Sequence, residues 1–181
     1  VPEYLPYTRP NTVYGMTDTC VIIAALALEF YLDRPTSVGP VMPNLEARCV
    51  NDAGEVLAAN EIGEIQVRGA PVIRGYLNRP EATAETIVDG WLHTGDVGYL
   101  DDDGFLYLVD RAKDMVLRGG ENVYCAEVEN VVFQHNAVAE CAAFSVPDER
   151  LGEEVGIAVF LKPGAALSAD HLRAHCKELL A

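Results

Sequence analysis

The sequence has no closely paired cysteines, little positive charge and no apolar run long enough to cross a membrane. The five cysteines, at positions 20, 49, 125, 141 and 176, include no C-x-x-C pair and have no histidine at metal-site spacing. We therefore expect free thiols, buried or half-buried, in a reducing cytoplasm. The longest apolar run, from Cys20 to Leu28 and past Glu29 to Leu32, is shorter than the roughly 18 residues of a membrane span. It predicts a buried element.

Positive charge is scarce because 13 Lys and Arg stand against 28 Asp and Glu, which leaves a formal net charge of −15. Such a chain is a poor electrostatic ligand for nucleic-acid backbones or anionic membranes. An anionic small molecule would need local positive groups, helix termini or a metal ion. Half of the 181 residues are hydrophobic, enough for the core of one domain or of two small ones.

Strand patterns dominate the first two thirds of the chain. Leu45 to Val50 reads as a strand, and Ile65 and Val67 alternate with polar neighbours in the period of a half-buried strand. Phe105 to Val109 is apolar throughout and predicts a strand buried on both faces. Pro80 suits the first turn of a short helix that runs to about Ile87.

The remaining third predicts a small α+β unit that begins near Arg111. Its expected elements are a hairpin around Gly119-Gly120, a helix from Ala126 to His135, strands at 138–146 and 155–161, and a last helix capped by Ser168. The helical pair His171 and His175 could face one metal ion, but no third ligand is near in sequence. We read His135, His171 and His175, which fall within predicted helices, as packing or surface residues.

Five short motifs occur in a fixed order along the chain. They are Tyr14–Asp18 (YGMTD), Gly63–Gly69 (GEIQVRG, followed by Gly75-Tyr76), Gly90–Asp96 (GWLHTGD), Asp110–Asp114 (DRAKD) and Gly119–Asn122 (GGEN). Each is weak alone, but in this order they closely resemble the adenylate-forming superfamily of acyl-CoA synthetases, firefly luciferase and nonribosomal peptide adenylation domains. TGD and DRxKD followed by GGEN look most like the acid–CoA ligase branch.

The resemblance implies an α+β fold in two parts. Residues 1–110 would form the β-rich, distorted barrel-like end of a large N-terminal AMP-binding domain. Residues 111–181 would form the first part of a small mobile C-terminal domain, without its terminal lysine segment. The implied reaction has two steps: a carboxylate attacks the α-phosphate of ATP, and the thiol of coenzyme A then displaces AMP from the acyl-adenylate. ATP, Mg²⁺ and coenzyme A are the implied cofactors.

The resemblance also assigns nucleotide contacts. Asp96 would accept both hydroxyls of the ribose, which suits its two oxygens, and Arg111 would donate to ribose or phosphate through its fixed fork. Tyr14 would stack on adenine, and Gly15 and Met16 complete this binding loop. From the residues alone, Asp96 could equally cap a turn, Arg111 could be a surface ion pair, and the loop could be an ordinary turn.

Thr17 and Asp18 take the catalytic positions of the resemblance. Thr17 would hydrogen-bond the α-phosphate, and the acidic residue after it is the usual Mg²⁺ ligand of the family. The chain departs from the pattern here, because that position is usually Glu and this sequence has Asp18. A shorter carboxylate still binds a hard cation, directly or through water, so the difference concerns metal geometry and rate.

Residues of the second part are implied to act in the second step. Lys113 falls at the hinge about which the small domain rotates between the two half-reactions. Gly119 and Gly120 would line the coenzyme A tunnel, where the missing β-carbons permit close approach. A tight hairpin turn is the plain alternative for the two glycines, and both roles are compatible.

Other functions stay open at this point. The adenylate could be passed to a carrier protein instead of coenzyme A, or the chain could be a non-catalytic nucleotide-binding or structural module. The apolar stretch Val21 to Leu28 hints at an apolar acid, fatty or aromatic, but core packing explains it equally well. No feature suggests nucleic acid as a partner.

The sequence lacks the Ser/Thr/Gly-rich phosphate loop and the terminal Gly-Lys that the resemblance calls for, so we expect a fragment of a longer ligase. The 181-residue chain alone should then give negligible ATP–pyrophosphate exchange, because it lacks the main groups that stabilise charge in the transition state. Turnover near that of a complete synthetase would contradict this expectation.

Overall fold

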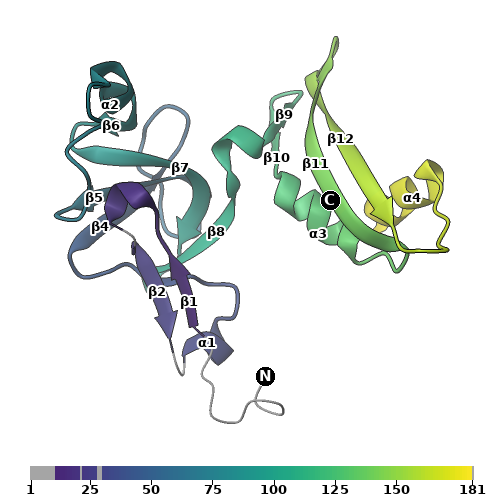
Figure 1. Cartoon of the computed structure of the whole chain (residues 1–181), viewed down its shortest axis with the longest axis horizontal. Coiled ribbons are helices and arrows are strands. Elements are labelled where there is room, and N and C mark those ends of the chain that lie inside the picture. Colours follow the sequence, from purple (N-terminus) through teal and green to yellow (C-terminus); the bar gives the residue numbers. More distant parts are fainter. Residues whose placement is uncertain (1–10, 21, 28–29, 181) are drawn as a thin grey trace. The chain divides into compact units, whose positions relative to one another are not determined.

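Two groups of strands organise the chain, one in each of two structural units. The computed structural model describes residues 11–20, 22–27 and 30–180, so Val21, Leu28 and Glu29 of the apolar run lie outside the described residues. The chain divides into Val1–Leu108 and Val109–Ala181, two residues before the predicted boundary. The chain is α+β and strand-rich (Figure 1).

The first unit is built on an antiparallel sheet in the order β3-β8-β7-β5-β4. Its strands are β3 (Gly39–Pro40), β8 (Phe105–Arg111), β7 (Trp91–Leu100), β5 (Gly63–Gly69) and β4 (Leu45–Val50), and the short β6 (Ile87–Val88) also pairs with β7. The path ends at β3 and β4. Among the described residues this sheet is therefore open, which corrects the barrel-like expectation.

One face of this sheet carries the core of the first unit. Ile65 and Val67 of β5 are fully buried and cluster with Leu92 and Leu106. The prediction of a half-buried strand was wrong here, because Gln66 between them is also buried. Leu108, two residues beyond Leu106 on β8, is 40% exposed. The prediction that this strand is buried along its length was wrong, because β3 pairs only with Phe105 and Leu106.

A separate hairpin carries the first motif. Strands β1 (Asn11–Tyr14) and β2 (Ala24–Ala27) pair antiparallel, with Tyr14 opposite Ala24, and the 3₁₀ turn η1 (Thr17–Thr19) lies between them. Gly39 brings β3 against β2: a β-carbon at Gly39 would lie 2.1 Å from the Ala25 backbone, and its φ of +100° favours glycine. The helices of this unit are α1 (Phe30–Asp33) and α2 (Pro80–Thr86), the latter as predicted from Pro80.

The acidic turn between β7 and β8 is tied to the rest of the first unit. Asp101 accepts hydrogen bonds from the amides of Asp103 and Phe105, and it forms an ion pair with Arg34. The Arg34 guanidinium also lies over the Phe105 ring, 4.2 Å from its centroid. Although burial acts in the opposite direction, the amide of Phe105 and Arg34 hold the pKa of Asp101 below its usual value. These contacts hold the β7–β8 turn in place against the rest of the first unit.

The second unit is a four-stranded sheet with two helices. Its strand order is β10-β9-β12-β11, with β9 (Val116–Arg118), β10 (Glu121–Val123), β11 (Val138–Asp148) and β12 (Gly152–Leu161). Helices α3 (Cys125–Phe133) and α4 (Ala169–Leu179) accompany it, and Ser168 caps α4 by accepting from the His171 amide at 3.3 Å. The predicted hairpin, strands and capped helix are thus confirmed.

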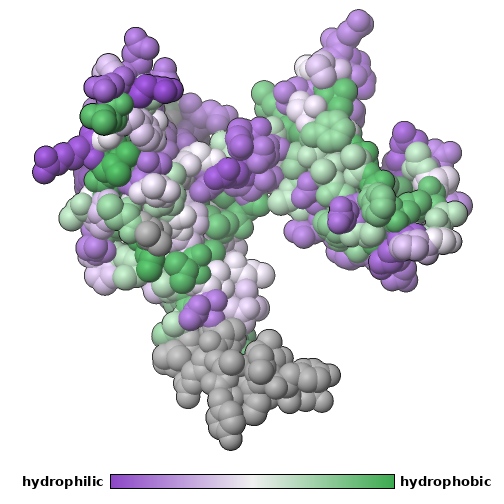
Figure 2. All heavy atoms as spheres, in the orientation of Figure 1, coloured by the Kyte–Doolittle hydropathy of each residue, from purple (hydrophilic) through white to green (hydrophobic). Residues whose placement is uncertain are grey.

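The core of this unit consists of Val132, Val138 and Leu172. Figure 2 shows hydrophobic residues on the surface around β12, and Phe144 and Phe160 are exposed there. In the described part of the chain, no helix is both long enough and apolar enough to span a bilayer.

Leu106→Ala tests the first core, because this side chain of β8 is fully buried in the hydrophobic cluster of the first unit. We expect it to lower the free energy of unfolding by about 2–5 kcal/mol, since the substitution leaves a cavity. Leu108→Ala, on the same strand but 40% exposed, is the matched control and should cost clearly less. Urea denaturation measures both, and equal losses would contradict the assignment of Leu106 to the core.

Candidate functional site

A bulge in β7 forms the centre of the site. In the pairing of β5 with β7, Glu64 lies opposite Val97 and Gln66 lies opposite His93. The single residue Ile65 therefore faces three residues, Thr94 to Asp96. Such a bulge bends a strand and re-aims its side chains, and it interrupts the ladder hydrogen bonds.

Thr94 and Gly95 allow the strand to take this shape. The buried Thr94 hydroxyl donates to the carbonyl of Ile65 at 2.7 Å and accepts from the amide of Asp96 at 3.1 Å. Gly95 has a φ of +71°, in the left-handed region that glycine adopts without strain. The TGD motif therefore suits the bulge: the Thr94 hydroxyl replaces hydrogen bonds that the sheet ladder loses, and Gly95 takes the left-handed conformation.

Asp96 and Tyr14 meet across this site although 82 residues separate them. The Tyr14 hydroxyl donates to Asp96 Oδ2 at 2.7 Å. Tyr14 is 7% exposed and ends β1, whereas Asp96 is half-buried on the bulge. The first and third motifs therefore converge on one carboxylate. A carboxylate has about four acceptor positions, so it can accept from Tyr14 and still hold hydroxyls of a ligand.

The loop after Tyr14 lies at the same end of β1. Gly15 and Thr17 are exposed, Met16 and Asp18 are half-buried, and η1 holds Thr17 and Asp18. The backbone carbonyl of Asp18 accepts from the Ile73 amide at 2.9 Å. Among the residues that the structure describes, no group of three or more His, Cys, Asp or Glu is arranged to hold a metal by itself. A cation at Asp18 would need ligand oxygens from elsewhere.

The other predicted site residues belong to the second unit. Arg111 is exposed at the end of β8, and Lys113 is exposed in the 3₁₀ turn η2 (Ala112–Asp114). Gly119 and Gly120 form the turn between β9 and β10, with φ values of +61° and +92°. The structure thus brings Tyr14, the following loop and Asp96 together in the first unit. Arg111, Lys113 and the two glycines belong to the second unit.

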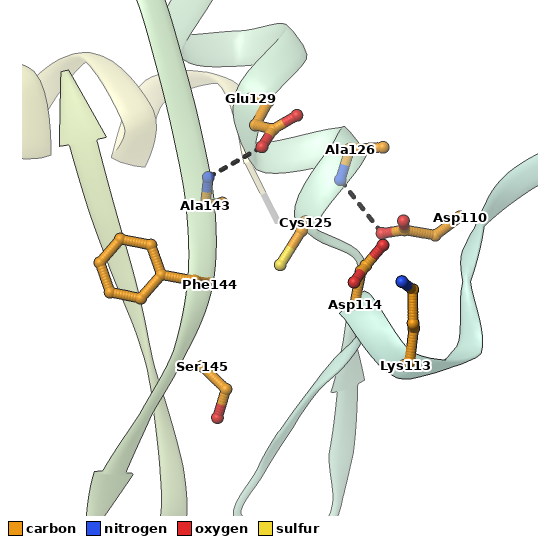
Figure 3. A pocket seen from close by; sticks show the side chains of 9 residues that line it. All are labelled: Asp110, Lys113, Asp114, Cys125, Ala126, Glu129, Ala143, Phe144 and Ser145. Atoms are coloured by element: carbon orange, nitrogen blue, oxygen red, sulfur yellow. Dashed lines mark hydrogen bonds between the residues drawn. The ribbon is translucent and has the colours of Figure 1, made fainter. Parts of the chain in front are cut away.

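A cavity of about 280 Å³ lies beside the predicted hinge residue (Figure 3). Lys113, Asp110 and Asp114 line one side, and Ala143 to Ser145 of β11 line the other. Asp110 accepts from the amide of Ala126, in the first turn of α3, at 3.1 Å. The segment that carries Lys113 is therefore attached to the helix that follows it.

The cysteines offer no activated nucleophile. All five are free, and four are buried or half-buried as expected, but Cys20 is exposed. Burial raises the pKa of the Cys49 thiol to about 11 and also raises that of Cys125, which lines the cavity of Figure 3. Both thiols are therefore protonated at neutral pH, and protonated thiols are poor nucleophiles.

Sequence reasoning missed one set of residues next to Asp96. His93 Nδ1 lies 2.7 Å from Glu64 Oε2, and Gly95 donates its amide to Glu64 Oε1 at 3.3 Å. Both Glu64 and His93 stand in motifs that the sequence analysis singled out, but neither was given a role. The only available signal was the presence of an acid in one motif and a histidine in another.

The chain belongs to the AMP-binding enzyme family. The profile of the AMP-binding enzymes matches residues 7–77, and that of the AMP-binding enzyme C-terminal domain matches residues 127–181. The 2-succinylbenzoate–CoA ligase of Geobacillus kaustophilus is 47% identical over 169 residues, which cover 93% of this chain and 34% of that protein. A Rhodococcus jostii ligase, named 3-[(3aS,4S,7aS)-7a-methyl-1,5-dioxo-octahydro-1H-inden-4-yl]propanoyl:CoA ligase, is 46% identical over 178 residues, covering 98% and 33%.

Solved structures of acyl-CoA synthetases also match this chain. The o-succinylbenzoate CoA synthetase of Bacillus subtilis, in complex with its acyl-adenylate intermediate, matches with a TM-score of 0.85 and 41% identity, over 94% of this chain and 35% of that one. The same enzyme has also been solved with ATP and a magnesium ion. The chain thus spans about a third of the length of the relatives it matches.

Thr94→Val tests the role of the hydroxyl in the bulge, because valine keeps the shape but can neither donate to Ile65 nor accept from Asp96. We expect it to lower the free energy of unfolding by about 1–3 kcal/mol, since buried polar groups lose their partners. Thr94→Ser keeps the hydroxyl and should cost about 1 kcal/mol or less. Urea denaturation measures the free energy of unfolding of both variants. Equal stability of Thr94→Val and Thr94→Ser would contradict the role of the hydroxyl.

Proposed function

We propose that this chain supplies nucleotide-binding and acyl-transfer elements of an ATP-dependent acid–CoA ligase. Such an enzyme joins a carboxylate to AMP with release of pyrophosphate, and then transfers the acyl group to the thiol of coenzyme A. The hydrogen bond between Tyr14 and Asp96 carries this proposal, because it unites two motifs 82 residues apart around one carboxylate. Family membership and the ligase names of the relatives support it.

The nucleotide is proposed to bind beside the hydrogen-bonded pair of Tyr14 and Asp96, with its adenine against the Tyr14 ring. The Asp96 carboxylate accepts the two ribose hydroxyls, and the Tyr14 hydroxyl fixes its orientation at 2.7 Å. The exposed Gly15 and the neighbouring Met16 border the adenine, and Gly15 has no side chain to hold it away. Arg111 donates to the ribose or phosphates through its planar fork.

Thr17 and Asp18 are proposed to handle the phosphates. The exposed Thr17 donates to the α-phosphate, and Asp18 binds Mg²⁺. Mg²⁺ is usually held by one or two carboxylates together with substrate phosphates and water, so a single aspartate fits this ion. When bound, the cation neutralises phosphate charge. The related o-succinylbenzoate CoA synthetase of Bacillus subtilis, solved with ATP and a magnesium ion, supports the choice of this cation.

Residues of the second unit are proposed to serve the thioester step. Lys113 is exposed in a short 3₁₀ turn between β8 and β9, where a change of backbone torsions meets little packing resistance. Gly119 and Gly120 border the pantetheine arm of coenzyme A. A β-carbon at Gly120 would meet nothing within 4 Å, so that side of the turn is open to a ligand.

The acid is proposed to be apolar and to carry a ring. The names of two relatives support the ring: one acts on 2-succinylbenzoate and the other on a propanoate attached to a fused ring system. A straight-chain fatty acid is the less favoured member of the same apolar class. We place the enzyme in the reducing cytoplasm, which suits its five free cysteines.

Asp96→Ala is the direct test of nucleotide binding. Calorimetry of the purified chain with AMP should detect binding, and the variant should bind about tenfold to a hundredfold more weakly, because charge-assisted hydrogen bonds to the ribose are lost.

Asp52→Ala, in the exposed turn after β4, is the control and should bind AMP like the unmodified chain. Equal affinity of the Asp96 variant and the unmodified chain would overturn the ribose assignment. Failure of the unmodified chain to bind AMP at about 10 mM would overturn the binding role of the chain itself.

A further inference from the structure

The bulge that presents Asp96 needs an external support, because its backbone cannot use the regular sheet ladder. Three residues of β7 face the single Ile65 of β5. Thr94 satisfies the Ile65 carbonyl and the Asp96 amide. The amide of Gly95 lies between them and has to find an acceptor of its own, since an unpaired backbone amide away from water is costly.

Glu64 supplies that acceptor from the neighbouring strand. Its Oε1 accepts from the Gly95 amide at 3.3 Å, and its Oε2 lies 2.7 Å from His93 Nδ1. One carboxylate thus contacts the residue that precedes the bulge and the residue at its middle. Because Gly95 is the immediate neighbour of Asp96, the Glu64 contact limits the torsions that aim the Asp96 carboxylate.

A chain of hydrogen bonds holds Glu64 in turn. A carboxylate only accepts, so His93 Nδ1 carries the proton that is shared with Glu64. Gln66 Nε2 contacts the His93 ring, 3.1 Å from Nε2 and 3.3 Å from Nδ1, and Gln66 Oε1 accepts from Arg48 Nε at 2.8 Å. Gln66 is only 2% exposed, so its position is set by packing. Arg48, Gln66 and His93 therefore form a row of consecutive polar contacts that ends at Glu64, which we call the relay.

The location of these residues separates this relay from an ordinary surface ion pair. An exposed pair adds about 1 kcal/mol or less to stability, and its loss should not reach a ligand site. Glu46 and Arg68 form such a pair on the same sheet, with Glu46 Oε2 2.6 Å from Arg68 Nη2 and side chains 63% and 46% exposed. Glu64 and His93 are 27% and 32% exposed and contact the bulge itself.

We propose that Glu64 is a positioning residue for Asp96 and that His93 orients Glu64. This inference rests on the proposed ribose role of Asp96. Glu64 does not touch the nucleotide; it keeps the bulge in the form that aims the carboxylate. Without it, the binding-competent form is less populated, and the apparent dissociation constant rises in proportion.

The test compares Glu64→Ala with Glu46→Ala by calorimetry against two ligands, AMP and 2′,3′-dideoxy-AMP. Glu64→Ala should weaken AMP binding by about threefold to tenfold, the expected result of a partly populated competent form. It should leave the dideoxy compound unaffected, because that ligand has no hydroxyls for Asp96. Glu46→Ala should change neither. Equal weakening of both ligands by Glu64→Ala, or no weakening, would overturn the proposal.

A double variant and a second readout keep the outcome clear. If Glu64 acts through Asp96, then Asp96→Ala combined with Glu64→Ala should bind AMP no more weakly than Asp96→Ala alone, and an additive loss would contradict this. Glu64→Leu, which fills similar space but cannot accept from the Gly95 amide, replaces Glu64→Ala if the latter does not fold. Hydrogen exchange of the Gly95 and Asp96 amides needs no nucleotide: it should accelerate in the Glu64 variant and not in Glu46→Ala, whatever becomes of the ribose assignment. Unchanged exchange would also overturn the proposal.

Discussion

The bulge of β7 is the constraint on which the site depends. A strand that accommodates three residues opposite one loses ladder hydrogen bonds, and those polar groups require other partners. Thr94 provides them from within the strand, and Glu64 provides one from β5. The displaced segment then directs Asp96 towards Tyr14. The bulge of β7 thereby presents the Asp96 carboxylate at the surface of a well-packed sheet.

The two units place their functional residues by different physical means. In the first unit, a sheet with fully buried Ile65 and Val67 on one face supports the bulge, and rigid elements hold a site more accurately than loops do. In the second unit, Lys113 lies in an exposed turn and Gly119-Gly120 in a tight hairpin, where torsions change at low cost. The first arrangement suits binding, and the second suits the movement that the proposed thioester step requires.

Much of the fold was predictable because it depends on short-range sequence signals. The proline at the start of α2 and the capping Ser168 each act on the residues next to them, and both predictions were confirmed. The one-sided burial predicted from the alternation around Ile65 was wrong, because Gln66 is also buried. The uniform burial predicted for Phe105 to Val109 was wrong, because burial depends on whether a neighbouring strand is present, and β3 ends too early to cover Leu108. The exposure of Cys20 was likewise not predictable from its own segment.

For the site, the sequence by itself determined the residue types and their order: the motifs, the glycine that permits the bulge, and the carboxylate it presents. Only the tertiary structure decided that Tyr14 meets Asp96 and that Glu64 meets Gly95, 31 residues away. The physical reason is the register of β5 against β7. A shift in register changes which side chains face each other, and it depends on packing and hydrogen bonding across the whole sheet. No short stretch of sequence contains that information.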